Sequence, residues 1–300
     1  MMPDDPLARF TDPAWLRPSP PALLAARADL AAAVADLLTI TDAELTKPWS
    51  WIGGSEDEVR YGFYRIGEVF ERAEVEARVL VSDRGLTADL IAPATAARWE
   101  LQGLLASLPD AAWDADPGSG EWTVRQTLGH VIGGQRGYGA ATAWWQAQGL
   151  PSDANLPTER PPVYAELPED EEEEAGTPAE VEARLGEVLD RSTERLAGMP
   201  ADRLGIGTRW AGFPVDIGFR IGRWSSHVRE HTIQVEKTLV MIAHTPTEVD
   251  RLIRLILAAW GRAEAVVYGS ADAGAALRVL TTAAAEARAT AAEVAGIVRR

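Results

Sequence analysis

Residues 121–130 read E-W-T-V-R-Q-T-L-G-H, and residues 223–235 read R-W-S-S-H-V-R-E-H-T-I-Q-V. The second stretch places His227 and His231 four residues apart, which puts both imidazoles on one face of a helix. The first stretch ends in His130, on a different expected helix. Two nitrogen ligands from one helix and a third from another would make a three-histidine metal site with one position left open. Such a site suits binding or chemistry rather than structural support.

Helix-start signals recur along the chain and predict an all-α fold. Each is followed by apolar residues at three- and four-residue spacing, and no segment shows the alternating pattern of a strand. Capping boxes are expected at Ser55–Glu58, Thr123–Gln126, Thr177–Glu180 and Thr245–Glu248. The expected helices lie near residues 20–42, 56–82, 93–108, 123–148, 178–198, 216–242, 247–267 and 273–298.

A long connector interrupts this series of helices at residues 149–176. Its prolines disfavour regular helix and its run of glutamates predicts a solvated surface loop. Four helices within 93–244, with this crossover between the second and the third, would form a four-helix bundle. The flanking helix pairs, in 15–92 and 245–300, are candidates for a second bundle.

A weak internal repeat supports the second bundle. The segment I-T-D-A-E-L-T-K-P-W-S-W, followed by V-R-Y-G-F-Y-R-I-G-E, resembles L-P-D-A-A-W-D-A-D-P followed by E-W-T-V-R-Q-T-L-G-H-V-I-G-G. In this register Arg65 replaces His130, and in a similar one Glu286 and Thr290 stand where His227 and His231 do. We hypothesise a duplicated bundle whose terminal helix pairs touch one another and whose central copy alone kept its ligands. The alternative is that alanine-rich amphipathic helices simply look alike.

The composition limits the classes of function. The 300 residues are 46% hydrophobic and 25% charged, as in ordinary globular proteins, and the net charge of −16 opposes binding to nucleic acid or to anionic membranes. The acidic, proline-rich start lacks the features of a signal peptide, and no apolar run is long enough to span a bilayer, so we expect a cytoplasmic protein. The chain has no cysteine, so any thiol chemistry would use an external thiol.

The two motifs together resemble the DinB/YfiT superfamily of metal-binding four-helix bundles. In that family the second helix carries a tryptophan, a Ser or Thr, a basic residue, a leucine and the first histidine ligand, as in residues 122–130. The fourth helix carries two histidines at i and i+4, with a glutamine three residues on. The resemblance covers about 93–242. It implies an up-down-down-up bundle that binds a divalent ion, usually zinc or nickel, through His130, His227 and His231.

Several members of that superfamily are transferases or isomerases that depend on a low-molecular-weight thiol such as mycothiol, bacillithiol or glutathione. The resemblance therefore implies a thiol-dependent reaction on a small-molecule substrate. An ion with an open position would favour deprotonation of a bound thiol, but it would also acidify a bound water. A metal-dependent hydrolase and a non-catalytic protein that binds a metal or small ligand thus stay open as alternatives. Many such bundles dimerise, so a homodimer also stays open.

Three further residues are weaker candidates for the site. Gln234 shares the helix face of the two histidines and could orient an imidazole. Arg223, four residues before His227, could hold an anionic group of a substrate. Tyr138, two turns beyond His130, could donate a phenol hydrogen bond. The helix of His130 is also crowded with glycines, which destabilise helices, so we expect close helix contacts or open space beside a site: Gly129, Gly133, Gly134, Gly137 and Gly139.

Overall fold

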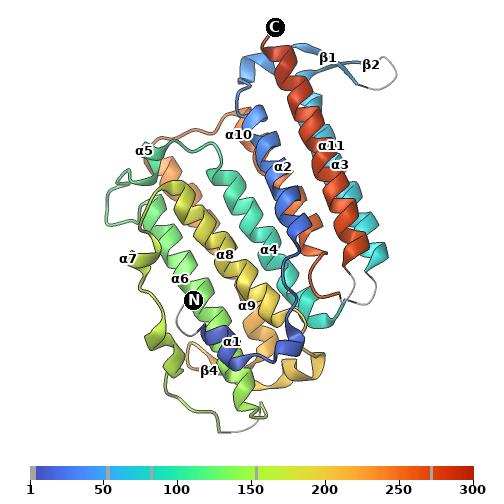
Figure 1. Ribbon diagram of the computed structural model, residues 1–300. Helices are drawn as coiled ribbons and strands as arrows, with labels where there is room; N and C mark the ends of the chain where they lie inside the picture. Colours follow the sequence, from blue (N-terminus) through green and yellow to red (C-terminus); the bar gives the residue numbers. More distant parts are fainter. Residues whose placement is uncertain (1–4, 52–54, 82–83, 153–154, 271–272) are drawn as a thin grey trace.

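The structure is a computed structural model that describes residues 5–51, 55–81, 84–152, 155–270 and 273–300 (Figure 1). The first four residues of the acidic N-terminus, the expected helix end at residue 82 and residues 153–154 of the connector lie outside the described residues. Within the described ranges, helices dominate and the all-α prediction is confirmed. No helix in these ranges is long and apolar enough to cross a membrane.

A central four-helix bundle occupies the middle of the chain. Each helix packs against two others, in the cyclic order α4, α9, α6, α8. The directions are up, down, down and up, as expected, and the long crossover lies between the second and third helices (Figure 1). The four helices are α4 (Leu86–Leu105), α6 (Val124–Gln148), α8 (Pro178–Leu196) and α9 (Ile217–Met241).

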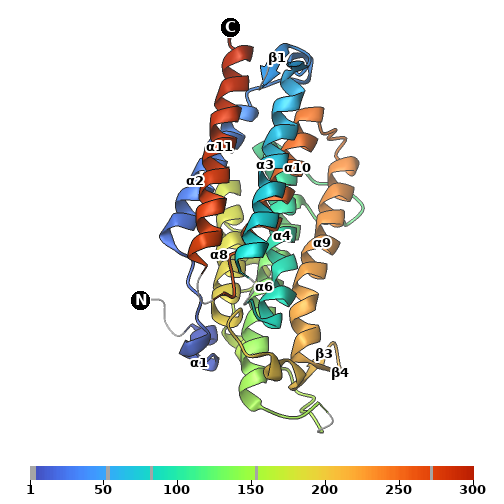
Figure 2. The ribbon, with the colours of Figure 1, turned by 90° about the vertical axis from the view of Figure 1, so that its right-hand side faces the viewer.

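The four flanking helices pack into a second bundle beside the first one (Figures 1 and 2). They follow the cyclic order α2, α11, α3, α10, and α10 also packs against α4 of the central bundle. The terminal helix pairs therefore touch one another, which is the geometric condition of the duplication hypothesis. The duplication itself stays a hypothesis. The four helices are α2 (Pro21–Leu37), α3 (Val59–Leu80), α10 (Glu248–Ala265) and α11 (Gly274–Val298).

Ion pairs record the directions of the helices in the second bundle. Asp29 and Asp36 of α2 pair with Arg288 of α11 and with Arg299 at its C-terminal end, in the same order along both helices, so these two helices run parallel. The ion pairs between α3 and α10 are ordered in the same way: Arg60 with Glu248, and Glu74 with Arg262. The second bundle thus has the same up-down-down-up arrangement as the central bundle. In the sequence, the whole central bundle lies between α3 and α10, which are the second and third helices of the second bundle.

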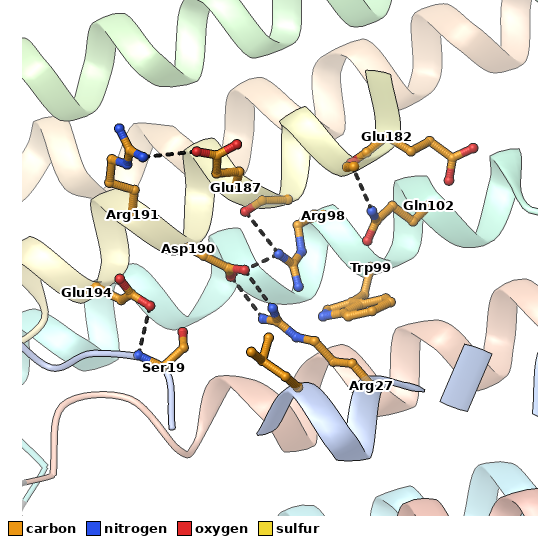
Figure 3. Close-up of a pocket in the computed structure, with 13 residues that line it drawn as sticks. Ser19, Arg27, Arg98, Trp99, Gln102, Glu182, Glu187, Asp190, Arg191 and Glu194 are labelled. Atoms are coloured by element: carbon orange, nitrogen blue, oxygen red, sulfur yellow. Dashed lines mark hydrogen bonds and ion pairs between the residues drawn. The ribbon is translucent and has the colours of Figure 1, made fainter. Parts of the chain in front are cut away.

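One apolar core runs through both bundles, and buried charges join them as well. Arg27 of α2 and Arg98 of α4 each pair with both Asp190 of α8 and Glu264 of α10. Figure 3 shows the two arginines converging on Asp190. Glu264 is fully buried and also accepts a hydrogen bond from the indole of Trp260. This charge cluster ties two helices of each bundle to one another.

Two of the four expected capping boxes are confirmed, at Thr123–Gln126 and Thr177–Glu180. The box expected at Thr245 lies two residues later, where Thr247 and Asp250 cap α10. The box expected at Ser55 was wrong, because residues 55–58 form a strand and α3 begins only at Val59. The expected start of a helix at residue 93 was also wrong, since α4 begins at Leu86 and continues through Pro93.

Two short hairpins were missed from the sequence. Their strands have four residues each, which is too short for a clear alternating pattern. In the second hairpin, Ala211 and Gly212 link the strands with φ of 45° and 88°, as a tight two-residue turn requires. The hairpins consist of β1 (Pro48–Trp51) with β2 (Ser55–Glu58), and β3 (Gly207–Trp210) with β4 (Phe213–Asp216).

Candidate metal centre

The antiparallel packing of α6 against α9 brings the three expected histidines together. His130 projects from α6, and His227 and His231 project from successive turns of α9. The distances between ring centroids are 5.5 Å for His130 and His227, 4.8 Å for His130 and His231, and 4.5 Å for the α9 pair. One ring nitrogen from each histidine lies within 4.8 Å of the other two, which is close enough for a shared ion.

Hydrogen bonds orient two of the rings through Nδ1. His130 Nδ1 lies 2.9 Å from Asp170 Oδ2, and His231 Nδ1 lies 2.8 Å from Gln234 Oε1. An Nδ1–H that donates to these oxygens leaves Nε2 without its proton, so Nε2 is the atom free to bind a metal. Gln234 therefore stands where the sequence suggested, although its effect on function stays a prediction.

The third ring is held by Gln135 of α6. Its amide nitrogen lies 3.2 Å from His227 Nδ1 and donates to the backbone oxygen of Trp224, while its amide oxygen has no partner within the described ranges. This nitrogen can donate to both atoms with its two hydrogens, and exchanging it with Oε1 would place two acceptor oxygens 3.0 Å apart. Gln135 thereby fixes the orientation of the His227 ring through Nδ1.

Burial keeps the α9 histidines neutral. His227 is only 5% exposed, and its pKa is lowered to about 3, first by burial and then by His231 and His130. Burial also lowers the pKa of His231. Since a protonated imidazole cannot bind a metal, these shifts favour the ligand form at neutral pH.

Gly134 makes room for His227, which accounts for one glycine of α6. A Cβ at this position would lie 2.6 Å from His227 Cε1 and 3.1 Å from Nε2. Close contact with neighbouring segments accounts for others, since a Cβ at Gly129 would lie 2.6 Å from the backbone oxygen of Asp170. The glycines of α6 thus serve both close packing and space beside the histidines.

We expect Gly134→Ala to weaken metal binding while α6 stays helical. Alanine stabilises a helix interior relative to glycine, so lost secondary structure would not explain the effect. Displacement of the His227 ring should lower the metal affinity about tenfold or more, by analogy with loss of an orienting group. Competition with a chromogenic chelator measures this affinity. Gly222→Ala on α9 is the matched control, because a Cβ there meets nothing within 4 Å. Unchanged affinity in Gly134→Ala would contradict the role assigned to this glycine.

The expected solvated connector instead forms part of the site. It contains a short helix, α7 (Asp170–Glu173), which packs against α6 and positions Asp170 beside His130. Glu173 is 2% exposed rather than solvated, because Arg136 and Arg184 pair with it. The prediction failed here because these partners lie outside the acidic run, on α6 and α8.

The two remaining site candidates lie near the cluster but differ in their surroundings. The Tyr138 ring meets the His227 ring edge-on at 4.9 Å, and burial raises the pKa of the phenol to about 12, so it stays a donor. Arg223 is bound to Glu230 by two hydrogen bonds of 2.8 and 2.9 Å and stacks over Trp210. Its guanidinium is therefore bound to a carboxylate of its own helix and is not free to bind a ligand.

A cavity of about 430 Å³ lies on the other side of Tyr138. Four of its twelve lining residues are aromatic, and the ring of Trp210 of β3 packs against the Tyr138 ring at 4.7 Å. Trp224 of α9 is 1% exposed and belongs to the core. The cavity is lined by Tyr138, Trp145, Thr158, Glu159, Arg160, Pro161, Tyr164, Arg209, Trp210, Ala211, Gly212 and Arg220.

The fold and the cluster define an up-down-down-up helical bundle with three histidines gathered between its second and fourth helices. The family model of the DinB superfamily matches residues 94–235, which include all three histidines, and this part of the chain belongs to that superfamily. No curated protein and no solved structure matches the chain.

Proposed function

We propose that the protein is a metalloenzyme that holds zinc or nickel through His130, His227 and His231 and uses a low-molecular-weight thiol in a transfer or isomerisation reaction on a small molecule. The observation that carries this proposal is the convergence of three oriented imidazoles, with Tyr138 between them and a cavity that could hold a small molecule. The chain has no cysteine, so the thiol would come from a cosubstrate.

The donor set fits a divalent ion with an open position. Imidazole nitrogen suits zinc and nickel, and three protein ligands are typical of sites that also accept a substrate. The space that Gly134 leaves for His227 supports this fit. When bound, such an ion supplies Lewis acidity and favours the deprotonated form of a thiol or a water.

The protein's own groups would orient the reactants. Asp170 and Gln234 hold a proton at Nδ1 of two imidazoles and so keep Nε2 pointed at the shared position. The phenol of Tyr138 stays protonated and is a candidate donor to an oxygen of the substrate. The aromatic residues of the cavity would pack against an apolar portion of the substrate.

Thiol binding tests this proposal. We expect glutathione, mycothiol or bacillithiol to bind the zinc- or nickel-loaded protein in isothermal titration. The S-methyl derivative of the same thiol should bind much more weakly, because it has no proton to lose at sulfur. His231→Ala, which removes one ligand, should abolish the difference between thiol and S-methyl derivative. If no free thiol binds better than its derivative, the thiol-dependent function is wrong, and the hydrolase or the non-catalytic binding protein becomes the better reading.

A further inference from the structure

Arg220 carries a buried positive charge that pairs with no carboxylate of the described residues. It lies on the first turn of α9, lines the aromatic cavity and is 3% exposed. Its Nη1 donates to the backbone oxygen of Arg209 at 2.6 Å, and its Nη2 lies 3.5 Å from the hydroxyl of Tyr164. Its Nε has no acceptor in the described part of the chain.

The comparison with Arg98 shows how unusual this environment is. Arg98 is 2% exposed, and it is paired with Asp190 and Glu264. Removing an ion from water costs several kcal/mol unless a counter-ion compensates. The described residues give Arg220 two neutral oxygens and the face of the Trp210 ring, whose centroid lies 5.3 Å from the guanidinium carbon, so the carboxylates that compensate Arg98 have no counterpart among them at Arg220.

The other charged residues that line the cavity also give it a positive charge. Besides Arg220, the walls include Arg160 and Arg209, and Glu159 is the only acidic residue among the lining residues. Three positive charges against one negative charge give the lining a formal charge of +2, in a chain whose net charge is −16. The side chain of Arg209 is held by the backbone oxygens of Leu156 and Gly212, and no carboxylate of the described ranges pairs with it.

We propose that this cavity binds the oxyanion group of a small molecule, with Arg220 as the buried anchor. A carboxylate, phosphate or sulfonate would accept from the unpartnered Nε and supply the missing counter-charge. Tyr138, Tyr164 and Trp210 would pack against a flat or apolar portion next to that group. The site therefore selects anionic molecules with an aromatic or unsaturated body over neutral ones.

The position of the cavity relates this anion site to the histidines. Arg220 lies seven residues before His227 on the same helix, or about 10 Å along its axis. Tyr138 forms a wall of the cavity and also contacts the His227 ring. Only the statement that the bound anion is the substrate rests on the proposed function; the anion site itself does not.

Benzoate and benzamide provide the test, because they share a shape and differ in charge. In isothermal titration of metal-free protein, benzoate should bind about tenfold or more tightly than benzamide, as one hydrogen bond to a charged group would give. Arg220→Gln should remove this preference, and Arg220→Lys should keep part of it. Arg229→Gln is the matched control, since it removes the same charge from an exposed position of the same helix.

The outcomes separate this proposal from the thiol function. Equal binding of benzoate and benzamide to the wild-type protein, or an unchanged preference in Arg220→Gln, would overturn the anion site. If Arg220→Gln does not fold, the wild-type comparison and Arg220→Lys decide. The titration uses neither metal nor thiol, so a failed thiol test leaves it intact. Competition between benzoate and S-methylglutathione then shows whether the anionic group belongs to the thiol, and independent binding would assign it to the second substrate.

Discussion

Replacement of His227 by alanine is expected to lower the divalent metal content from about one ion per chain to nearly none. Three ligands leave little redundancy, and the remaining pair, His130 and His231, would come from different helices. His227 is also the most deeply buried of the three, with an exposed fraction of 5%. Elemental analysis of protein purified without added chelator measures the change directly.

The control for this experiment is the fourth histidine of the chain. His244 lies in the turn after α9 and is not part of the cluster, so His244→Ala should keep its metal. Far-UV circular dichroism should show both variants to be helical, because loss of the imidazole alters one side chain inside a large core. Equal metal content in His227→Ala and wild-type protein would mean that the cluster does not hold the ion.

The main elements of the site could be predicted because their signals are local. A helix places residues four apart on one face, so His227 and His231 had to lie together once α9 was expected. Gln234 follows from the same geometry. The capping boxes at Thr123 and Thr177 marked the helix starts within one residue. His130 required the combination of both motifs, because nothing in its own helix indicates which other helix it faces.

The remaining elements depend on contacts between distant segments. Asp170 reaches His130 across 40 residues of sequence, and Gln135 reaches His227 across 92. Their neighbours in sequence give no sign of these partners. Arg220 was missed for a related reason, since an arginine at a helix start is ordinarily exposed. Only the hairpin of β3 and β4, whose Arg209 backbone accepts from Arg220, makes it a buried charge.

Arg65 and Glu286, which align with histidines in the proposed repeat, form ion pairs in the second bundle. Arg65 pairs with Glu68 and stacks over Trp51, and Glu286 pairs with Arg72 across the α3–α11 contact. Side chains that neutralise one another in pairs leave no shared ligand position. The matching helix order of the two bundles supports the duplication hypothesis, and these pairs give a physical reason why a metal site would be confined to the central bundle.

Glu264→Ala is expected to destabilise the whole chain by about 3–5 kcal/mol, the usual cost of removing one partner from a buried ion pair. The substitution leaves Arg27 and Arg98 with Asp190 as their one shared carboxylate, and it also removes the acceptor of the Trp260 indole. Because the cluster joins α2 and α10 to α4 and α8, both bundles should lose stability together. Chemical unfolding followed by circular dichroism and by tryptophan fluorescence measures the effect.

An exposed ion pair provides the reference for this loss of stability. Glu286→Ala breaks an ion pair with Arg72, whose side chains are 36% and 58% exposed, so it should cost about 1 kcal/mol or less. Glu264→Gln removes the charge but keeps one amide oxygen, which can accept from Arg27 Nη2 and Arg98 Nη2 as Oε1 does. Its amide nitrogen cannot replace the oxygen that accepts from Arg27 Nε and the Trp260 indole, so this variant should fall between the two alanine variants. If Glu264→Ala were no more harmful than Glu286→Ala, the buried charges would not hold the bundles together, and the apolar contact of α4 with α10 would have to do so alone.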